Sequence, residues 1–491
     1  MNKNKIVILI FLLTLIFRLY FVFTTPYFAD DNAYYNMRQI DNILENNKPI
    51  FEDDLSYSGK EQLFSPVFYY FMSAFVFIFG DVALKVLPEI LISSLVIIVY
   101  LIIKSITNDD KAILFSSFIA GFIPILITNT LNNISVYALA LPLTFLTLLA
   151  FIRLENKRYL NLFIILSVLL PLVHPIAFLL SLSFILYLLI SKSEDVKIMN
   201  LNKEAIFFFV FVTLFIEFLI YRNAFLTQGF NAVWQNIPDK ILDRYFINVN
   251  LGKILLGLGI MPLLFALIGV YFGIFRQRNN VMVLFSSMLL GILLILSFKL
   301  INFEIGVLFL AITVTILSSV GFEKFFKYIE ITKMANIKNY IMMLLFLIVV
   351  LTLVLPAYVN AQNVIKNGFN DDEFKALKWI KDNTEEDAVI FSSIDEGNFV
   401  TAVSNRKNVM DENFLLVKNI NEKYNDVEEF FTTTSIAKSV NIMSKYNADY
   451  VYISDRTKKI YNRESFSYLE DKTCFRESYN GNGEKIYKRR C

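Results

Sequence analysis

Residues 6–38, IVILIFLLTLIFRLYFVFTTPYFADDNAYYNMR, join a long apolar segment to a short acidic one. The apolar part runs to Thr25 with Arg18 as its single charge, and it is long enough to cross about 30 Å of hydrocarbon as a helix. No small-residue cleavage site follows, which favours a retained span over a signal peptide. Asp30 and Asp31 are therefore predicted to lie in water beside the mouth of a membrane helix, where a membrane enzyme would keep a base.

The rest of the composition is that of an α-helical polytopic membrane protein. Of 491 residues 56% are hydrophobic, 49 are Phe and only 18% are charged. A soluble domain could not bury so much apolar surface. Long runs almost without charge predict eleven spans, at 6–25, 83–103, 112–128, 136–152, 160–173, 175–190, 205–221, 254–275, 281–297, 303–320 and 339–357.

The apolar segment 64–80 is short and opens with Ser65-Pro66, so its length does not show whether it crosses the membrane. The distribution of Lys and Arg between the loops is the remaining criterion. If it does not cross, the loops on the cytoplasmic side carry 16 Lys and Arg and the outer loops carry 8. If it crosses, this bias is inverted and the positive-inside rule is violated. The segment is therefore predicted to be an interfacial or re-entrant helix. This topology places the N-terminus in the cytoplasm and the chain after Pro356 outside, in a multi-pass protein of the cell membrane.

Two domains follow from the shift in composition near Asn360. Residues 1–358 form a transmembrane domain with an outer loop at 26–63, and residues 359–491 have the charge content of a soluble domain. Helical patterns alternate there with short apolar runs, which predicts an extracytoplasmic α/β domain. The expected helices are 373–382 and 440–446, and the expected strands are 388–392 and 449–454.

The two cysteines, Cys474 and Cys491, both lie in this second domain. They either form one disulfide or remain separate in a loose C-terminal segment. Two cysteines support neither a disulfide framework nor a thiolate metal site.

The order of these features resembles the GT-C class of membrane glycosyltransferases, and most of all the archaeal relatives of the oligosaccharyltransferase catalytic subunit. Three segments carry the resemblance: Asp30–Arg38, Ala112–Ala140 and Ala376–Asn413. In the third, ALKWIKDNTEEDAVI is similar to the Trp-x-x-x-Asn-Thr-Pro-x-x-Ala region of that subunit. The following Ser393-Ile-Asp-Glu-Gly397 is similar to its Trp-Trp-Asp-Tyr-Gly motif.

The resemblance implies transfer of a sugar from a polyprenyl (dolichyl) phosphate donor, with inversion at the anomeric carbon, on the outer side of the membrane. Such a displacement needs a base opposite the phosphate, and Asp30 matches the position of that base. Asp31 is either its partner or the true base. Arg38 would suit a phosphate or a carboxylate. The alternative is that the two aspartates only cap the helix that follows them, and that Arg38 is a surface charge.

The sequence departs from the family in two places. Of the Trp-Trp-Asp-Tyr-Gly motif only Asp395 and Gly397 remain, so the acceptor side differs. The second outer loop, Thr128–Tyr137, has no carboxylate, whereas the family normally offers a pair of acidic metal ligands there. A divalent cation such as Mg²⁺ or Mn²⁺ prefers charged oxygen ligands, which weakens the case for a metal cofactor and favours a polyprenyl monophosphate donor.

Further residues predicted to contact the donor lie at the outer ends of spans: His174, Arg222, Arg244 and Lys299. Each also has a plainer interpretation. His174 could cap a helix end, the segment with Arg222 and Arg244 could be a connector, and Lys299 could reach the membrane interface. The acidic run at 52–54 is interpreted as a solvated surface.

Arg18 and Glu217 lie within apolar spans, where a charge is costly. Pairing between helices is the expected reason, and for Arg18 a position facing the donor is the alternative.

The expected partners are the lipid bilayer, a polyprenyl or dolichyl phosphate sugar, and a protein, lipid or glycan acceptor. No basic helix indicates nucleic acid. Two other functions stay open: a non-catalytic assembly protein that keeps this fold, and a transporter of polyprenyl lipids or glycans. A transporter would favour inverted repeats, which the sequence does not show clearly.

Overall fold

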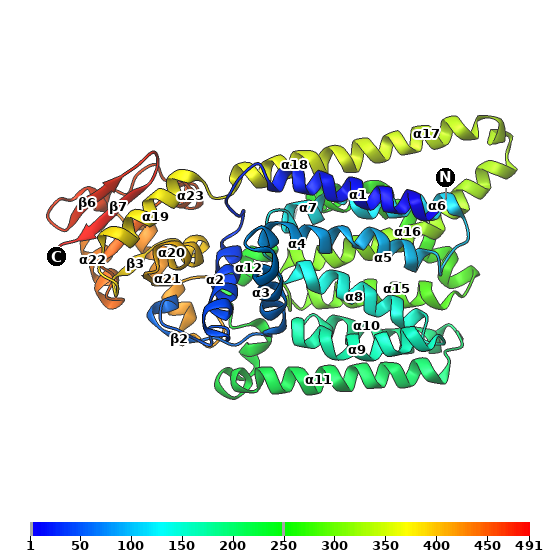
Figure 1. Cartoon of the computed structure of the whole chain (residues 1–491), viewed down its shortest axis with the longest axis horizontal. Coiled ribbons are helices and arrows are strands. Elements are labelled where there is room, and N and C mark those ends of the chain that lie inside the picture. Colours follow the sequence, from blue (N-terminus) through cyan, green and yellow to red (C-terminus); the bar gives the residue numbers. More distant parts are fainter. Residues whose placement is uncertain (1–2, 248–250) are drawn as a thin grey trace.

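The computed structural model describes residues 3–247 and 251–491 as a helical bundle with a smaller domain at one end. Figure 1 shows the bundle helices running along the long axis of the molecule, with the N-terminus at the end far from the smaller domain. The C-terminus lies in the smaller domain. The end of the bundle next to that domain is called the domain-side end below.

The bundle consists of helices that correspond to all eleven predicted spans. Four predicted spans are divided between two helices: 83–103 between α4 and α5, 112–128 between α6 and α7, 254–275 between α13 and α14, and 339–357 between α17 and α18. Pro124 occupies the first turn of α7. The helices are α1 (Lys3–Val22), α4 (Val82–Ser93), α5 (Leu95–Ile103), α6 (Asp110–Gly121), α7 (Pro124–Thr130), α8 (Tyr137–Ile152), α9 (Lys157–Val173), α10 (Ala177–Ser193), α11 (Asn200–Gln228), α13 (Leu251–Leu258), α14 (Ile260–Tyr271), α15 (Asn280–Ser297), α16 (Phe303–Ile331), α17 (Lys338–Val349) and α18 (Leu355–Asn367).

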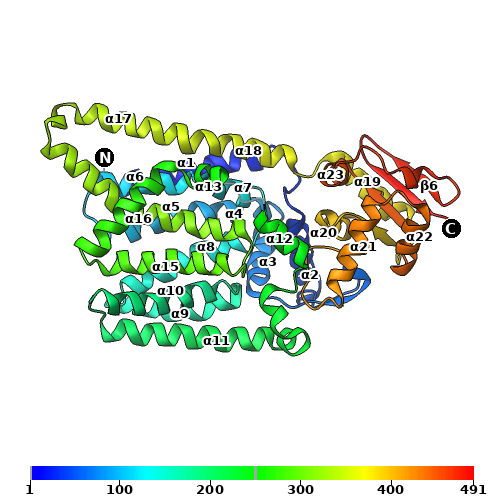
Figure 2. The same ribbon diagram turned by 180° about the vertical axis from the view of Figure 1, so that it is seen from behind.

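Length and composition identify this bundle as a multi-span membrane fold. Within the described residues, seven helical segments are long and apolar enough to cross a membrane, and shorter apolar helices accompany them. Two helices, α11 and α16, reach 29 residues each and extend well past the predicted spans. Helices α17 and α18 lie along the edge of the bundle opposite α11. They carry the chain from the far end of the bundle to the smaller domain (Figures 1 and 2).

Close packing in the bundle depends on glycine where α14 crosses α16. A Cβ atom on Gly269 would lie 2.0 Å from the carbonyl oxygen of Leu317, and one on Gly321 would lie 2.1 Å from that of Phe265. Phe265 also stacks on Phe322 with ring centroids 4.1 Å apart. The two backbones therefore touch at a point that admits no side chain.

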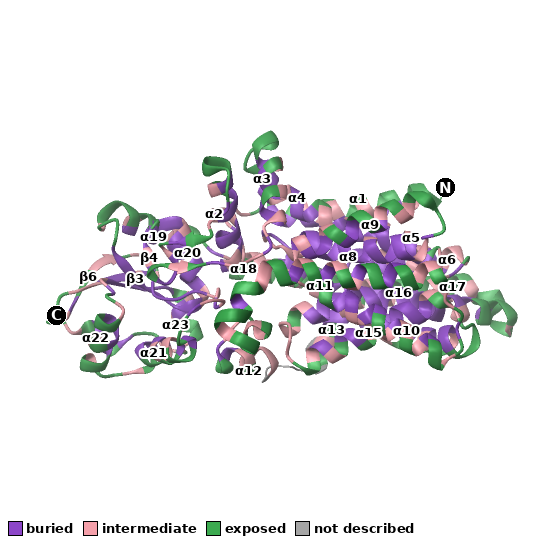
Figure 3. Cartoon of the chain, turned by 90° about the horizontal axis from the view of Figure 1, so that it is seen from below, coloured by how far each residue is buried: buried purple, intermediate pink, exposed green. Residues whose placement is uncertain are grey.

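Helices α2 (Asp31–Asn46) and α3 (Val67–Phe79) lie across the domain-side end of the bundle, roughly perpendicular to its long helices (Figures 1 and 3). Between them the chain forms strands β1 (Glu52–Asp53) and β2 (Lys60–Glu61), joined through the short helix η1 (Ser56–Ser58). At 13 residues, α3 is too short to span a bilayer. Its length and direction agree with the predicted interfacial helix.

The C-terminal domain contains a five-stranded mixed sheet in the order β4-β3-β5-β7-β6. Strand β3 pairs in parallel with β4 and β5, and the hairpin β6–β7 adds antiparallel strands at one edge. The predicted helices and strands correspond to α19, α22, β3 and β5. The elements are α19 (Asp371–Asn383), β3 (Val389–Phe391), η6 (Ile394–Glu396), α20 (Gly397–Ser404), β4 (Lys407–Asn408), α21 (Ile420–Thr432), α22 (Ile436–Lys445), β5 (Tyr450–Ile453), α23 (Asp455–Ile460), η7 (Ser467–Glu470), β6 (Phe475–Asn480) and β7 (Lys485–Arg489).

The two cysteines form a disulfide, which decides between the two alternatives left open by the sequence. Cys474 precedes β6 and Cys491 follows β7, so the bond joins the two ends of the hairpin. The backbone amide of Arg490 also donates to the carbonyl of Cys474 at 2.8 Å. The C-terminal segment is thereby attached to the sheet.

Candidate active site

Asp30 occupies the N-cap of α2, between the bundle and the C-terminal domain. Its backbone is extended, with φ −122° and ψ 145°, and its side chain is half-buried. Asn133, from the turn between α7 and α8, donates its side-chain amide to Asp30 Oδ2 at 3.1 Å. The second outer turn is therefore in contact with the Asp30 loop, through an amide rather than a carboxylate.

A hydrogen-bond network fixes the loop that carries Asp30. Lys85 Nζ donates to the carbonyl of Tyr27 at 2.8 Å and to Asn132 Oδ1 at 2.7 Å. The amide of Ala29 donates to the carbonyl of Asn132 at 3.1 Å. Glu89, inside α4, accepts from the Asn132 amide at 2.9 Å. The network therefore positions the Asp30 loop and the Asn133 turn together.

Asp31 is buried in the interface with the C-terminal domain, so the expectation that both aspartates lie in water is wrong for this residue. Its exposed fraction is 4%. Asp31 Oδ1 accepts from the amide of Phe399 at 2.7 Å, and Oδ2 accepts from the amide and side chain of Asn398 at 3.2 and 2.8 Å. These amides belong to the first turn of α20, which lacks intrahelical acceptors and attracts a carboxylate.

Burial disfavours the ionised form of both aspartates. It raises the pKa of Asp30 above its usual range, against the opposing effects of the Asn133 hydrogen bond and the nearby Arg456 cation. Burial also raises the pKa of Asp31 well above its usual range, although the α20 hydrogen bonds favour the charged form. Two neighbouring carboxyl groups thus have raised pKa values and different partners.

Glu412 is a site residue that the sequence analysis missed. Asn32, in the first turn of α2, donates to Glu412 Oε2 at 2.7 Å. The pKa of Glu412 lies well above its usual range because of burial and the negative charges of Asp395, Asp30 and Asp31. Glu412 lies in the Ala376–Asn413 stretch that resembles the family, but no motif within that stretch singles it out.

Asp30, Asp31, Glu412 and Asp395 together form a carboxylate cluster. Two of the predicted site residues, Arg244 and Asp395, form an ion pair at its edge. Arg244, on α12 (Asp239–Ile247), pairs with Asp395 at 3.6 Å. Lys299, just after α15, pairs with Asp243 of the same helix α12 at 2.7 Å. Helix α12 therefore connects Lys299 of the bundle with Asp395 of the C-terminal domain.

The segment after α11 folds into two short helices, η2 (Gly229–Trp234) and α12. Helix α11 continues through Arg222 to Gln228, which places Arg222 on an exposed helical surface. Among the described residues, Arg222 pairs with no carboxylate. Further along, Asn236 donates to the carbonyls of Phe414 and Val417 at 3.0 and 2.8 Å, holding the start of α12 against the C-terminal domain.

Arg38 has an internal partner, and the acidic run at 52–54 is not simply a solvated surface. Arg38 forms a two-pronged ion pair with Asp53, at 2.9 and 3.1 Å, and also donates to Thr401 Oγ1 at 3.1 Å. Asp53 is 2% exposed, and these contacts hold its pKa below its usual range despite burial. Arg38 therefore joins the outer loop to α20, which is a positioning contact.

His174 caps the start of the helix that follows it. Its Nδ1 accepts from the amide of Ile176 at 3.0 Å, and its ring lies 4.8 Å from that of Tyr137. The geometry matches the plainer interpretation of this histidine as a turn residue. Its contact with donor stays a prediction.

The Ser393–Gly397 segment is mostly a structural part of the C-terminal domain. Glu396 is fully buried and accepts hydrogen bonds of 2.5 Å from Ser393, Ser454 and Thr457. A Cβ atom on Gly397 would lie 2.3 Å from the carbonyl oxygen of Met410, so only glycine fits. Asp395 is the residue of this segment that faces the carboxylate cluster.

Comparison with known proteins supports a fold and leaves the activity open. No family model and no curated protein match the chain. Among solved structures, the Archaeoglobus fulgidus oligosaccharyltransferase in the apo form has a TM-score of 0.67 at 14% identity, over 98% of this chain and 74% of that one. Archaeal oligosaccharyltransferase AglB from Archaeoglobus fulgidus, in complex with an inhibitory peptide and a dolichol-phosphate, gives a TM-score of 0.67 at 14% identity, over 93% and 70%.

Another solved structure matches along nearly its full length. ArnT from Cupriavidus metallidurans, bound to undecaprenyl phosphate, has a TM-score of 0.58 at 9% identity, over 99% of this chain and 98% of that one. This chain has a GT-C fold. Identities this low show a shared fold alone, so the chemistry has to be argued from the residues.

The site of this GT-C fold does not fit a divalent cation held by side chains. Among residues 3–247 and 251–491, no three His, Cys, Asp or Glu side chains converge as metal ligands. The turn next to Asp30 supplies Asn132 and Asn133, whose neutral amides are poorer ligands for a hard cation than carboxylates.

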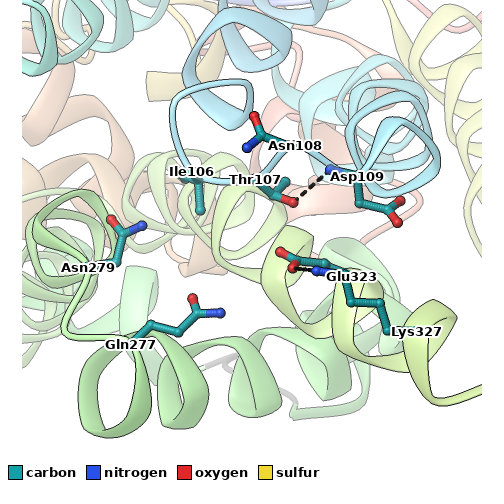
Figure 4. A pocket seen from close by; sticks show the side chains of 8 residues that line it. All are labelled: Ile106, Thr107, Asn108, Asp109, Gln277, Asn279, Glu323 and Lys327. Atoms are coloured by element: carbon teal, nitrogen blue, oxygen red, sulfur yellow. Dashed lines mark hydrogen bonds and ion pairs between the residues drawn. The ribbon is translucent and has the colours of Figure 1, made fainter. Parts of the chain in front are cut away.

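A separate hollow of about 540 Å³ lies at the far end of the bundle (Figure 4). Its lining comes from the α5–α6 turn, the segment before α15, and α16; the labelled side chains are Ile106, Thr107, Asn108, Asp109, Gln277, Asn279, Glu323 and Lys327. Asp109 and Asn279 are the N-caps of α6 and α15, which accounts for part of this polar lining. The hollow is far from Asp30 and takes no part in the site.

We expect Asp31→Asn to loosen the C-terminal domain. The asparagine side chain has one acceptor oxygen and presents an NH₂ group to the α20 amides, so it loses hydrogen bonds in a buried place. The expected loss of stability is about 1–3 kcal/mol. It is measured as a lower thermal unfolding midpoint and as faster proteolytic release of the C-terminal domain.

The matched control is Asp41→Asn, an exposed aspartate on the same helix. It should unfold and digest like the wild type. Equal proteolysis rates for Asp31→Asn and Asp41→Asn would show that the α20 contact does not hold the domain.

Proposed function

We propose that the protein is a membrane glycosyltransferase that takes a sugar from a polyprenyl phosphate donor and inverts its anomeric centre. The observation that carries the proposal is Asp30, a half-buried carboxylate held by Asn133 at the domain-side end of a GT-C fold. Two solved structures with this fold are complexes with a dolichol-phosphate and with undecaprenyl phosphate.

The proposed step is a single displacement. An acceptor oxygen or nitrogen attacks the anomeric carbon, and the bond from that carbon to the phosphate oxygen breaks. The electron pair leaves with the polyprenyl phosphate, and the acceptor proton moves to an Asp30 oxygen. The raised pKa of Asp30 makes it a stronger base than an exposed aspartate.

The other carboxyl groups position or complete the site. Asp31 is committed to three hydrogen bonds from α20, so it orients the loop and Asp30 is the base. Glu412, with its raised pKa and its contact to Asn32, is a hydrogen-bonding group for the acceptor or the sugar. Asp395 and Gly397 shape the acceptor side.

Cations at the domain-side end would stabilise the departing phosphate. Arg222 is exposed and pairs with no carboxylate among the described residues, which makes it the first choice. Arg244 and Lys299 hold ion pairs that a phosphate would have to share or replace. The proposal places this end, with the C-terminal domain, outside the cytoplasm.

The test is an assay of the purified protein with radiolabelled polyprenyl-monophosphate and polyprenyl-diphosphate sugars, followed as loss of label from the lipid. Turnover of one donor class supports the proposal and identifies the carrier. If the protein in a lipid bilayer turns over none of them, even with added acceptor peptides, lipids and glycans, the transferase assignment is wrong.

The pH dependence of turnover should reflect Asp30. Activity requires the ionised form, and burial raises the pKa of Asp30, so activity should fall on acidification already above the ordinary aspartate value of about 3.9. The measurement is a profile of initial rates between pH 4 and 9, with circular dichroism at each pH to exclude unfolding. A rate that stays flat down to the ordinary value would contradict a base with a raised pKa.

A further inference from the structure

Unpaired carboxyl groups occur both inside the bundle and at its domain-side end. Inside, the expectation of pairing between helices is confirmed for Arg18, which contacts Glu89 at 2.5 Å. It is wrong for Glu217, which is 2% exposed and has no hydrogen-bond partner among the described residues. At the domain-side end, Asp41 and Asp81 are unpaired beside a hollow that opens to the surface, where a ligand can reach them.

This hollow has a volume of about 580 Å³, which is within the usual range for small-ligand sites. It lies between the chain that leaves α1, the middle of α2 and the start of α4. Its apolar wall consists of Phe23, Phe28, Met37, Val82 and Leu84, and the carboxylates of Asp41 and Asp81 belong to its polar wall. The hollow therefore offers apolar contact and negative charge to the same occupant.

The two aspartates have no role inside the protein that accounts for their charge. Asp81 is the N-cap residue of α4, but its side chain accepts no hydrogen bond from that helix. Asp41 lies one helical turn before Glu45 on α2, a spacing at which like charges repel each other. Partial burial and the negative charges of Asp81 and Glu45 raise the pKa of Asp41 to about 6, which leaves it mostly ionised at neutral pH.

The single cation at the wall of the hollow is already committed. Lys85 Nζ donates to the carbonyls of Thr25 and Tyr27 at 3.2 and 2.8 Å and to Asn132 Oδ1 at 2.7 Å. Because an ammonium group has three protons, these bonds use all of them. Among the described residues, Lys85 forms no ion pair with either aspartate, so a positive charge that balances them has to come from outside the chain.

The open side of the hollow is at the membrane surface. Phe23 and Val82 in its wall are 59% and 58% exposed. Phe77, Ile78 and Phe79, at the end of α3 just before Asp81, are more than half exposed as well. Figure 3 shows exposed surface on α3, which packs against α4. Large exposed apolar side chains on a short helix that lies across the bundle end are typical of contact with the lipid interface.

We propose that this hollow binds the ammonium head group of a membrane lipid. Asp41 and Asp81 accept charge-assisted hydrogen bonds from the ammonium group, and Phe23 and Val82 contact the apolar part of the same lipid. A lipid fits better than a water-soluble amine, because an amine alone would leave the apolar wall uncovered. The site goes beyond the proposed transferase function and does not depend on it, so binding can be tested alone.

The test uses the full chain in nanodiscs that contain equal amounts of phosphatidylethanolamine and phosphatidylglycerol. Lipids that stay bound when the protein is released are identified by native mass spectrometry. The wild type should retain phosphatidylethanolamine in preference to phosphatidylglycerol, and Asp41→Asn/Asp81→Asn should lose about 10-fold or more of that preference. The control Glu52→Gln/Asp54→Asn removes two exposed carboxylates from the same outer loop and should retain lipids like the wild type.

Folding is checked by thermal unfolding in detergent without added lipid. Asp41→Asn/Asp81→Asn should unfold like the wild type there, because neither carboxylate has a protein partner to lose. The proposal is disproved if the wild type shows no preference for phosphatidylethanolamine, or if the double variant keeps it. Water-soluble glycerophosphoethanolamine, at a concentration equal to that of the lipid, should not displace phosphatidylethanolamine. Displacement would show that the hollow takes a free amine and would overturn the assignment to a lipid.

Discussion

Asp30→Asn should lower the rate of sugar transfer by about 10²–10⁴-fold, the usual contribution of a positioned general base. The variant keeps an oxygen that can accept the hydrogen bond from Asn133, so the loop geometry should persist. It loses the basic oxygen that takes the acceptor proton. The rate is measured as single-turnover transfer from the donor identified in the lipid panel.

Asp54→Asn is the matched control, because Asp54 is an exposed aspartate in the same outer loop. This control and the wild type should transfer at similar rates, and all three proteins should unfold at the same temperature. Transfer by Asp30→Asn within a few fold of the wild type would remove Asp30 from the mechanism. Glu412→Gln would then be the next variant, since Glu412 has a raised pKa in the same cluster.

The spans could be predicted because hydropathy is a local property of the chain. Each of the eleven predicted segments corresponds to helical structure, and the short segment 64–80 corresponds to α3 lying across the bundle end. The C-terminal α/β pattern was equally local. The hairpin β6–β7 escaped prediction because only Phe475 of strand β6 is buried and the strand has no apolar run.

The site was less predictable because its contacts join distant parts of the chain. The motif indicated Asp30, but nothing near Asp31 in sequence shows that Asn398 and Phe399 would bury it. The ion pair of Arg38 with Asp53 depends on how the outer loop folds back. Helix α12 is only nine residues long, so its stability depends on contact with the C-terminal domain.

Arg18→Met should destabilise the bundle by about 3–5 kcal/mol, the usual cost of removing one member of a buried ion pair. Arg18 and Glu89 are each 1% exposed and lie 2.5 Å apart, and Arg18 also donates to Thr130 at 2.9 Å. Without Arg18, the carboxylate of Glu89 is buried beside apolar helices. The measurement is the thermal unfolding midpoint in detergent, with Arg158→Met, at an exposed arginine of α9, as the control for loss of one positive charge.

The double variant Arg18→Met/Glu89→Met separates the ion pair from the rest of the network. Replacing both partners with apolar side chains removes the uncompensated charge, so the double variant should recover most of the stability. It should not recover full transfer activity, because Glu89 also holds the amide of Asn132 in the turn that contacts Asp30. A double variant that is as unstable as Arg18→Met would mean that Arg18 stabilises the bundle through Thr130 and packing instead. Recovered stability with full activity would show that the Asn132 turn keeps its position without Glu89.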